Sequence, residues 1–207
     1  KNGKKGDTKI DFSTYLSFTN VAKKLELLNA AEYKSVHKQM YENYLAQYPN
    51  ADVMMPSFVT SNTGVDTDWQ DTMLRNGISQ NYMFSIRGGS ENAQYSLSYN
   101  HADEKGIFLG NNHRQDNARL KLHLTKSIFD VDANIGFKFT DSDQPQYSIK
   151  EMYMISPLVP VYDESREYGF GLSDFDDLPS NRNVMADHHY VTASNKKYHM
   201  TANVALT

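Results

Sequence analysis

Six segments of this chain alternate between apolar and polar residues with a period of two, and this alternation restricts the folds available to it. Such alternation is typical of β-strands whose two faces meet unlike surroundings. In the longest segment Val131, Ile135 and Phe137 share one side, whereas Asp132 and Lys138 share the other. The segments lie near 8–18, 80–87, 93–102, 115–125, 128–141 and 198–206. Most have about 8–12 residues, close to the 9–11 that a tilted strand needs to cross a bilayer.

The connections between these segments alternate between long and short. Long stretches, 19–79 and 142–197, follow the first and fifth segments, whereas only 88–92 separate the second from the third. Little more than Lys126 and Ser127 separates the fourth from the fifth. Bacterial barrels have tight periplasmic turns and extended extracellular loops. The pattern therefore predicts an all-β fold, an antiparallel transmembrane β-barrel segment with helical loop insertions.

The composition is compatible with such a barrel. The mean hydropathy of −0.65 is low, but only alternate residues of a barrel strand face lipid. No stretch approaches the roughly 20 apolar residues of a membrane-spanning helix, which excludes a helical membrane protein. The 14 Tyr and 10 Phe residues suit a surface at a membrane interface.

The long connections contain helical signals. Asn29 and Glu32 form a capping pattern, after which apolar residues recur at helical spacing until Pro49. Shorter helices are predicted over 68–74 and 149–155, and an irregular loop over 163–183.

Several function classes lack support in the sequence. The formal net charge of −4 is spread along the chain, which does not favour nucleic-acid binding. The chain has no Cys, so thiolate catalysis and Cys-ligated zinc are excluded. Neither a phosphate loop nor a nucleophile elbow is found. We therefore expect no enzymatic activity and no cofactor.

Two clusters carry metal-ligating residue types. Acidic residues gather at 163–164 and 174–177, but their spacing is not that of a calcium loop, so a solvated loop is favoured. His188 and His189 are adjacent, and in a strand they would point to opposite faces. We therefore predict no metal site.

The polar sides of the strands supply the candidate ligand-binding residues. If the apolar sides meet lipid, the lumen receives Arg87, Arg119, Lys121, Asp130, Asp132 and Lys138. These charges would meet a plug or a hydrated substrate, or they would pair with one another across strands, which is the favoured alternative. Trp69 is a loop candidate for stacking on a sugar, although a packing role is favoured.

An ordered set of motifs resembles one family. The motifs are Lys4-Lys5-Gly6, the stretch 24–33, Thr67-Asp68-Trp69-Gln70-Asp71, Gln80-Asn81-Tyr82, Gly88-Gly89-Ser90, Glu104-Lys105-Gly106-Ile107 and the stretch 156–162. Together they are similar to the SusC/RagA branch of TonB-dependent outer-membrane transporters of Bacteroidetes, in the region just after the plug. Residues 1–7 would end the plug, and the rest would be the first six or so of about 22 barrel strands.

The resemblance implies a parent protein in the outer membrane of a Gram-negative bacterium, in contact with lipid and lipopolysaccharide. It implies import of a large nutrient, a glycan or an oligopeptide, driven by the TonB complex through an N-terminal region absent from this sequence. A SusD-like surface lipoprotein would be the partner. The final run, 203–207, ends without a turn, so we expect a piece of a larger protein.

Two other hypotheses remain open. A soluble β-sandwich that binds carbohydrate would pack the apolar faces into a dry core, with Phe84, Leu120, Phe137 and Val204 mutually buried. An esterase or glycosidase has the least support.

Overall fold

The computed structural model describes residues 6–191 and 193–207, and the chain forms two compact units. Among the described residues, the strand unit comprises 6–20, 76–144 and 193–207, and the loop unit comprises 21–75 and 145–191. Most of the predicted plug ending at 1–7 lies outside the described residues. Gly6 and Asp7 are already in the first strand.

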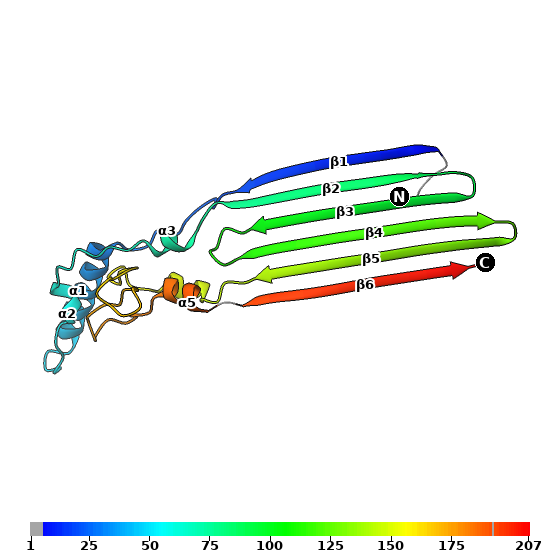
Figure 1. Cartoon of the computed structure of the whole chain (residues 1–207). Coiled ribbons are helices and arrows are strands. Elements are labelled where there is room, and N and C mark those ends of the chain that lie inside the picture. Colours follow the sequence, from blue (N-terminus) through cyan, green and yellow to red (C-terminus); the bar gives the residue numbers. More distant parts are fainter. Residues whose placement is uncertain (1–5, 192) are drawn as a thin grey trace. The chain divides into compact units, whose positions relative to one another are not determined.

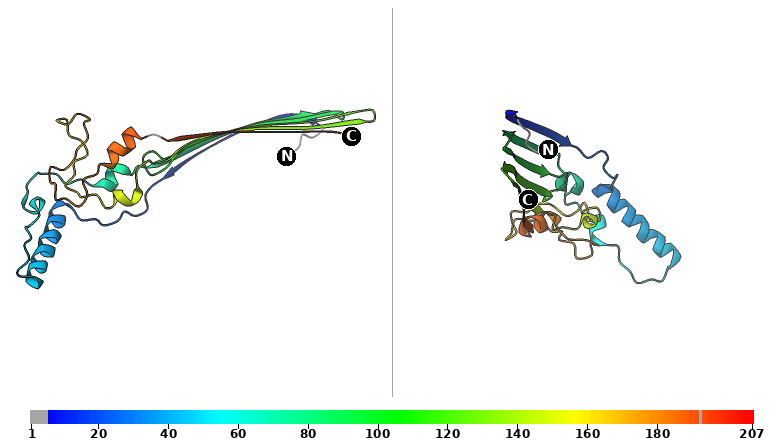
Figure 2. Two further views of the ribbon diagram at one scale, coloured as in Figure 1. Left: turned by 90° about the horizontal axis from the view of Figure 1, so that it is seen from below. Right: turned by 90° about the vertical axis from the view of Figure 1, so that its right-hand side faces the viewer.

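The strand unit is one antiparallel sheet in which each of six strands pairs with the next along the chain (Figure 1). The strands are β1 (Gly6–Thr19), β2 (Gly77–Gly89), β3 (Ala93–Lys105), β4 (Asn112–Lys126), β5 (Phe129–Asp143) and β6 (Ser194–Leu206). Seen edge-on, the sheet is a single twisted layer (Figure 2). The predicted antiparallel all-β class with helical insertions is confirmed.

The β-sandwich alternative is wrong, because the described residues form no second sheet that packs on the first. The residues that a sandwich would bury together do not form a dry core. Phe84 is 37% exposed, Phe137 is 45% exposed and Val204 is 70% exposed. The apolar side chains of this sheet are therefore uncovered within the described part of the chain.

Two tight turns connect strands at one end of the sheet. Gly89 has a φ of +155°, and a Cβ there would collide with the Ala93 carbonyl oxygen, so only glycine fits. Ser127, between β4 and β5, has a φ of 59°, a conformation in which a non-glycine residue is uncommon. These turns fix the register of the β2–β3 and β4–β5 pairs.

The strands extend beyond the alternating segments, mainly at the end away from these turns. β2 begins at Gly77, β3 ends at Lys105 and β6 begins at Ser194. Charged side chains break the alternation there, but main-chain pairing continues through partners such as Asp141 and Lys196. The side-chain pattern therefore underestimates the strand lengths.

The loop unit contains the helices α1 (Ala30–Gln47), α2 (Ser57–Thr60), α3 (Trp69–Met73), α4 (Ile149–Met152) and α5 (Val184–Tyr190). The predicted capping box is present: the Glu32 backbone N–H donates to Asn29 Oδ1 over 2.9 Å, and the Asn29 N–H donates to Glu32 Oε2 over 3.0 Å. α4 ends three residues earlier than predicted, and residues 153–155 form a turn. α2 and α5 were not predicted.

The loop unit has its own apolar core. Its most deeply buried side chains are Phe58, Met73, Met152, Leu158, Val159 and Val184. They come from α2, α3, α4, α5 and the turn at 156–159. No helix in the described residues has the length and apolar character that membrane crossing requires.

Candidate functional site

One face of the sheet, here called the polar face, gathers the charged candidates. Arg119 of β4 lies opposite Ser98 of β3 and Gly136 of β5. Lys138 of β5 lies opposite Asn117 of β4. By register and strand alternation the same face carries Arg87, Lys121, Asp130 and Asp132. The sheet therefore brings all six strand candidates onto one surface.

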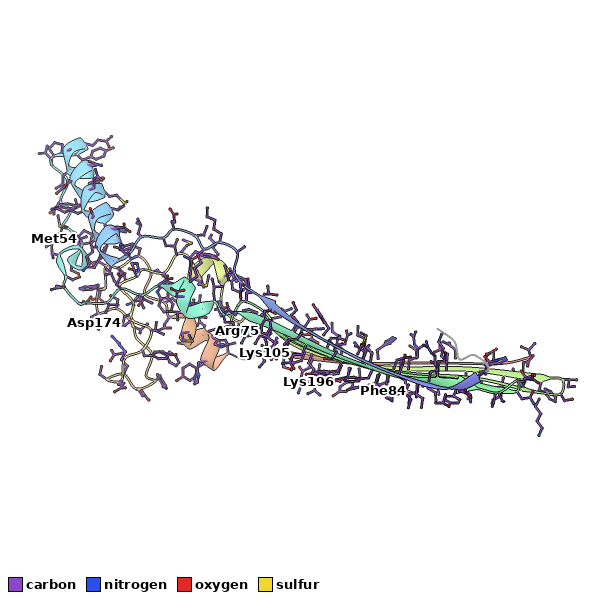
Figure 3. The ribbon with its side chains drawn as sticks, turned by 90° about the horizontal axis from the view of Figure 1, so that it is seen from above. Met54, Arg75, Phe84, Lys105, Asp174 and Lys196 are labelled. Atoms are coloured by element: carbon purple, nitrogen blue, oxygen red, sulfur yellow. The ribbon has the colours of Figure 1, made fainter. Side chains whose placement is uncertain are left out.

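The opposite face, here called the apolar face, has the inverse composition. Phe137 lies between Ala118 and Met200 on the neighbouring strands. Phe84, which projects from β2, belongs to this face (Figure 3). Large apolar side chains are exposed on all six strands. An exposed apolar surface of this size on a soluble protein usually marks an interaction site.

Two of the predicted lumen residues have polar partners on a neighbouring strand. Arg87 Nη2 lies 3.1 Å from Asp11 Oδ2, and His123 Nδ1 lies 2.8 Å from Asp132 Oδ1. For Arg87 and Asp132 these contacts are of the cross-strand kind that the sequence pattern favoured over contact with a plug or substrate. The Arg87–Asp11 ion pair is partly exposed, so it contributes only about 0–1 kcal/mol.

Arg119 and Lys138 differ from Arg87, because within the described residues neither makes an ion pair or a side-chain hydrogen bond. Nearby, Asn100 and Asn134 each have a buried Oδ1 atom without a donor in that part of the chain. Buried polar atoms in folded proteins almost always have partners. Polar groups on this face are therefore left without partners from the described chain.

A shallow concavity of about 660 Å³ lies on the polar face. Its lining includes Asp11, Ser98, Asn117, Arg119, Gly136 and Lys138. Asp11 is the one carboxylate among the described residues that line it, and this carboxylate already pairs with Arg87. The concavity thus presents a cationic, hydrogen-bonding surface.

Trp69 lies in the loop unit and is only 2% exposed. Its indole Nε1–H donates to the Ser156 carbonyl over 3.2 Å. The neighbouring Gln70 side chain accepts from the Leu25 N–H and donates to the Leu25 carbonyl, at 2.9 and 2.7 Å. A buried indole offers no ring face for stacking on a sugar, so its position fits the packing role.

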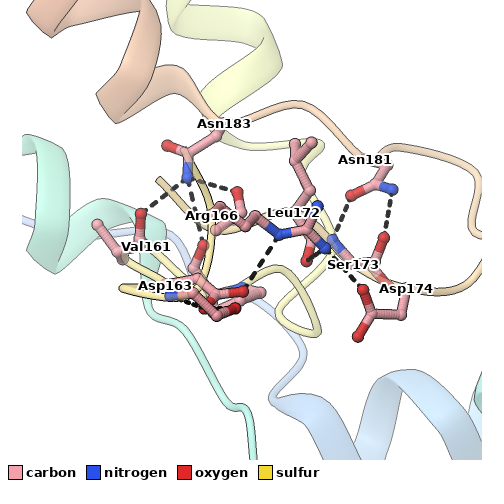
Figure 4. Close-up of polar contacts among 11 residues, drawn as sticks. Val161, Asp163, Arg166, Leu172, Ser173, Asp174, Asn181 and Asn183 are labelled. Carbon is pink, nitrogen blue, oxygen red and sulfur yellow. Dashed lines mark hydrogen bonds and ion pairs between the residues drawn. The ribbon is translucent and has the colours of Figure 1, made fainter. Parts of the chain in front are cut away.

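Asn183 organises the segment between α4 and α5, and sequence reasoning did not single it out. Its Nδ2 donates to the carbonyls of Val161 and Gly171 over 2.9 and 2.8 Å, and to that of Pro160 (Figure 4). Its Oδ1 accepts from two backbone N–H groups at the start of α5. The sequence signal is an Asn at the N-cap of a short helix.

The acidic residues of this segment are partly neutralised by arginine. Arg166 contacts Asp163 at 3.1 Å and Asp174 at 2.6 Å. Hydrogen bonds from Ser165 and the guanidinium of Arg166 lower the pKa of Asp163. Asp177 accepts a hydrogen bond from the Ser57 hydroxyl over 3.0 Å. The described residues contain no group of three or more side chains placed to hold a metal ion.

His188 and His189 lie in α5, so the strand geometry assumed from sequence is wrong. Asn183 caps this helix, which explains why the pair is helical. Burial lowers the pKa of His188, and the positive charges of Arg75 and His189 lower it further. Burial also lowers the pKa of His37, and it raises that of Tyr147 to about 12.

Comparison with known proteins places these features in context. No family model matches the chain. It is 28% identical over 178 residues, 82% of its length, to the TonB-dependent receptor SusC of Bacteroides thetaiotaomicron. It is 26% identical over 138 residues, 67% of its length, to the TonB-dependent receptor P3 of Formosa agariphila.

Solved structures show the same fold. The whole chain superposes on the RagAB peptide importer in its closed-closed state, with a TM-score of 0.63 and 14% identity. The open-open state gives a TM-score of 0.63 with 13% identity. The matched region is 16% and 12% of the two sequence relatives and 27% of the RagAB chains. The resemblance to SusC/RagA-type TonB-dependent receptors is confirmed.

Proposed function

We propose that this chain, a relative of SusC/RagA-type TonB-dependent receptors, forms part of the wall and extracellular loops of an outer-membrane transport barrel. The observation that carries the proposal is the two-faced sheet. Its apolar side chains are exposed along one side, while Arg119, Lys138 and their polar neighbours line the other. Barrels of outer-membrane transporters need this division between lipid and lumen.

The sheet edges support closure with further strands. Within the described residues β1 pairs only with β2, and β6 pairs only with β5. An exposed edge strand presents unpaired backbone N–H and C=O groups, which a barrel removes by closing. The chain would supply the first six strands after a plug, with residues 1–5 as the end of that plug and β1 beginning at Gly6.

The loop unit would lie outside the cell. The tight turns at 90–92 and 127–128 lie at one end of the sheet, and the two insertions of the loop unit leave it at the other. In bacterial barrels the short turns are periplasmic and the long loops are extracellular. The loop unit, which has its own apolar core, would then be a folded extracellular part of the protein.

The parent protein would import a large nutrient, an oligopeptide or a glycan, with energy from the TonB complex. A SusD-like surface lipoprotein would be its partner. Lipid and lipopolysaccharide would contact the apolar face. The chain would contribute no catalytic residue, and its sequence relatives are named as receptors.

The topology can be tested on intact cells that express the full-length protein. One epitope replaces the exposed stretch at Asp176, and a second is inserted at Glu91 in the β2–β3 turn. Antibody should label the first on intact cells and the second only after the outer membrane is permeabilised. Labelling of the Glu91 epitope on intact cells would contradict the proposal. Uptake of fluorescent oligopeptides and oligosaccharides, with and without a protonophore, then identifies the nutrient class.

A further inference from the structure

We propose that Arg119 and Lys138 form an anion-binding subsite that takes a carboxylate of an acidic oligopeptide. The inference rests on the proposed function, because it treats the polar face as the surface that a transported molecule meets. It goes further by naming the residues and the chemistry of the contact.

The register places the two cations close together. Arg119 lies opposite Gly136, and Lys138 lies two residues further along the same strand, opposite Asn117. Side chains related in this diagonal way have Cα atoms about 7–8 Å apart, within reach of long side chains. The two oxygens of one carboxylate can therefore accept from both cations, since each charged hydrogen bond spans about 2.7–2.9 Å.

Gly136 keeps the space between the cations open. A Cβ built on Gly136 would meet only the Arg119 Nε, at 4.0 Å. Gly136 therefore lines the concavity without a side chain of its own, and the Arg119 side chain is its nearest neighbour there. A glycine in the interior of a strand weakens that strand and often marks close approach of a ligand or another backbone.

The charge balance of the face selects an anion. Arg87 has Asp11 as its partner, and Asp132 has His123. Arg119 and Lys138 have no such partner among the described residues, and Asp11 is already engaged. Ser98 and Asn117 add uncharged hydrogen-bonding groups to the same concavity. A guanidinium fork beside an ammonium suits a carboxylate.

An acidic oligopeptide is the carboxylate source that we assign. The solved structures that share this fold are those of a peptide importer. A uronic-acid oligosaccharide also carries carboxylates, so the binding test includes one as the alternative ligand.

The test measures binding of fluorescein-labelled hexaglutamate to the full-length protein purified in detergent, by fluorescence anisotropy at low ionic strength. Arg119→Gln and Lys138→Gln should each weaken binding about tenfold or more, because each removes a charged hydrogen bond. Hexaglutamine should bind weakly to every variant. Lys196→Gln is the matched control, since this lysine lies on the other face of the sheet and pairs with Asp141.

Gly136→Val tests the geometry without removing a charge. Valine favours strands and has open space here, so the variant should fold while its side chain fills that space and weakens binding. Wild-type affinity in Arg119→Gln, Lys138→Gln and Gly136→Val would overturn the subsite. Binding of hexagalacturonate without binding of hexaglutamate would overturn the assignment to a peptide. Membrane fractionation of cells tests the proposed function separately. If the wild-type protein is absent from the outer membrane, the proposed function is contradicted, whatever the peptide-binding result.

Discussion

Asn183 shows how one side chain can hold a long connection in a defined conformation. Its amide bonds to five backbone groups and is 4% exposed. Asn183→Ala would leave several buried donors and acceptors unpaired, each at a cost of about 1–3 kcal/mol. We expect the loop unit to lose more than about 2 kcal/mol of stability. Faster amide hydrogen exchange in α5 would report this loss, and Asn50→Ala at an exposed site is the control.

We expect His188 to make the loop unit sensitive to acid. Its pKa lies below the ordinary 6.5 because of burial and the nearby positive charges of Arg75 and His189. Between the folded-state pKa and 6.5 the unfolded chain binds more protons than the folded chain, so stability falls as the pH drops through this window. The protection factors of the α5 amides, which correct for the slower intrinsic exchange at low pH, should therefore fall from pH 7.5 to about pH 5.5. His188→Gln should reduce this pH dependence, and an undiminished dependence would contradict the assignment to His188.

The strand candidates could be placed on one face from sequence, because alternation alone decides which residues share a side. The pairing of Arg87 with Asp11 could not be predicted. It depends on the register between β1 and β2, which are separated by the first insertion of the loop unit. The packing role favoured for Trp69 agrees with its burial, but its partner Ser156 could not be predicted, because it is 87 residues away.

At the scale of one strand, β5 carries the sharpest division between the two faces. Phe137→Lys places a charge on the apolar face, where a lysine at the bilayer midplane costs about 2–4 kcal/mol. We expect this loss in the free energy of unfolding of the full-length protein from lipid vesicles, measured with guanidinium. Asn134→Lys, on the polar face of the same strand, should change it little. Equal destabilisation by both substitutions would argue against a lipid-facing side.

Elements with a strong local signal could be predicted, and those without one could not. α1 has the Asn29–Glu32 capping box and a long helical repeat, so its start is located correctly. α5 has only seven residues, and two adjacent histidines obscure its pattern. The ends of β3 and β6 extend past the alternation because backbone pairing does not depend on apolar side chains.

At the scale of the whole molecule, the open sheet predicts how the isolated chain behaves. β1 and β6 each have one unpaired edge in the described structure, and the apolar face is uncovered. Such edges and faces promote association. The isolated 207-residue chain should therefore not be a monodisperse monomer in buffer without detergent, as measured by size-exclusion chromatography with light scattering. A monodisperse chain that unfolds cooperatively would contradict the barrel-wall account.

The central claim, that one face of this sheet meets lipid and the other meets water, can be tested along β5 in the full-length protein. Single cysteines at residues 131–140 carry a nitroxide in lipid vesicles, and collision rates with oxygen and with a water-soluble nickel complex are compared. The account predicts a period of two, with oxygen contact highest at Val131, Ile135, Phe137 and Phe139, and with lower oxygen contact at Asp132, Asn134 and Lys138. Uniform accessibility, or alternation of the opposite phase, would contradict it.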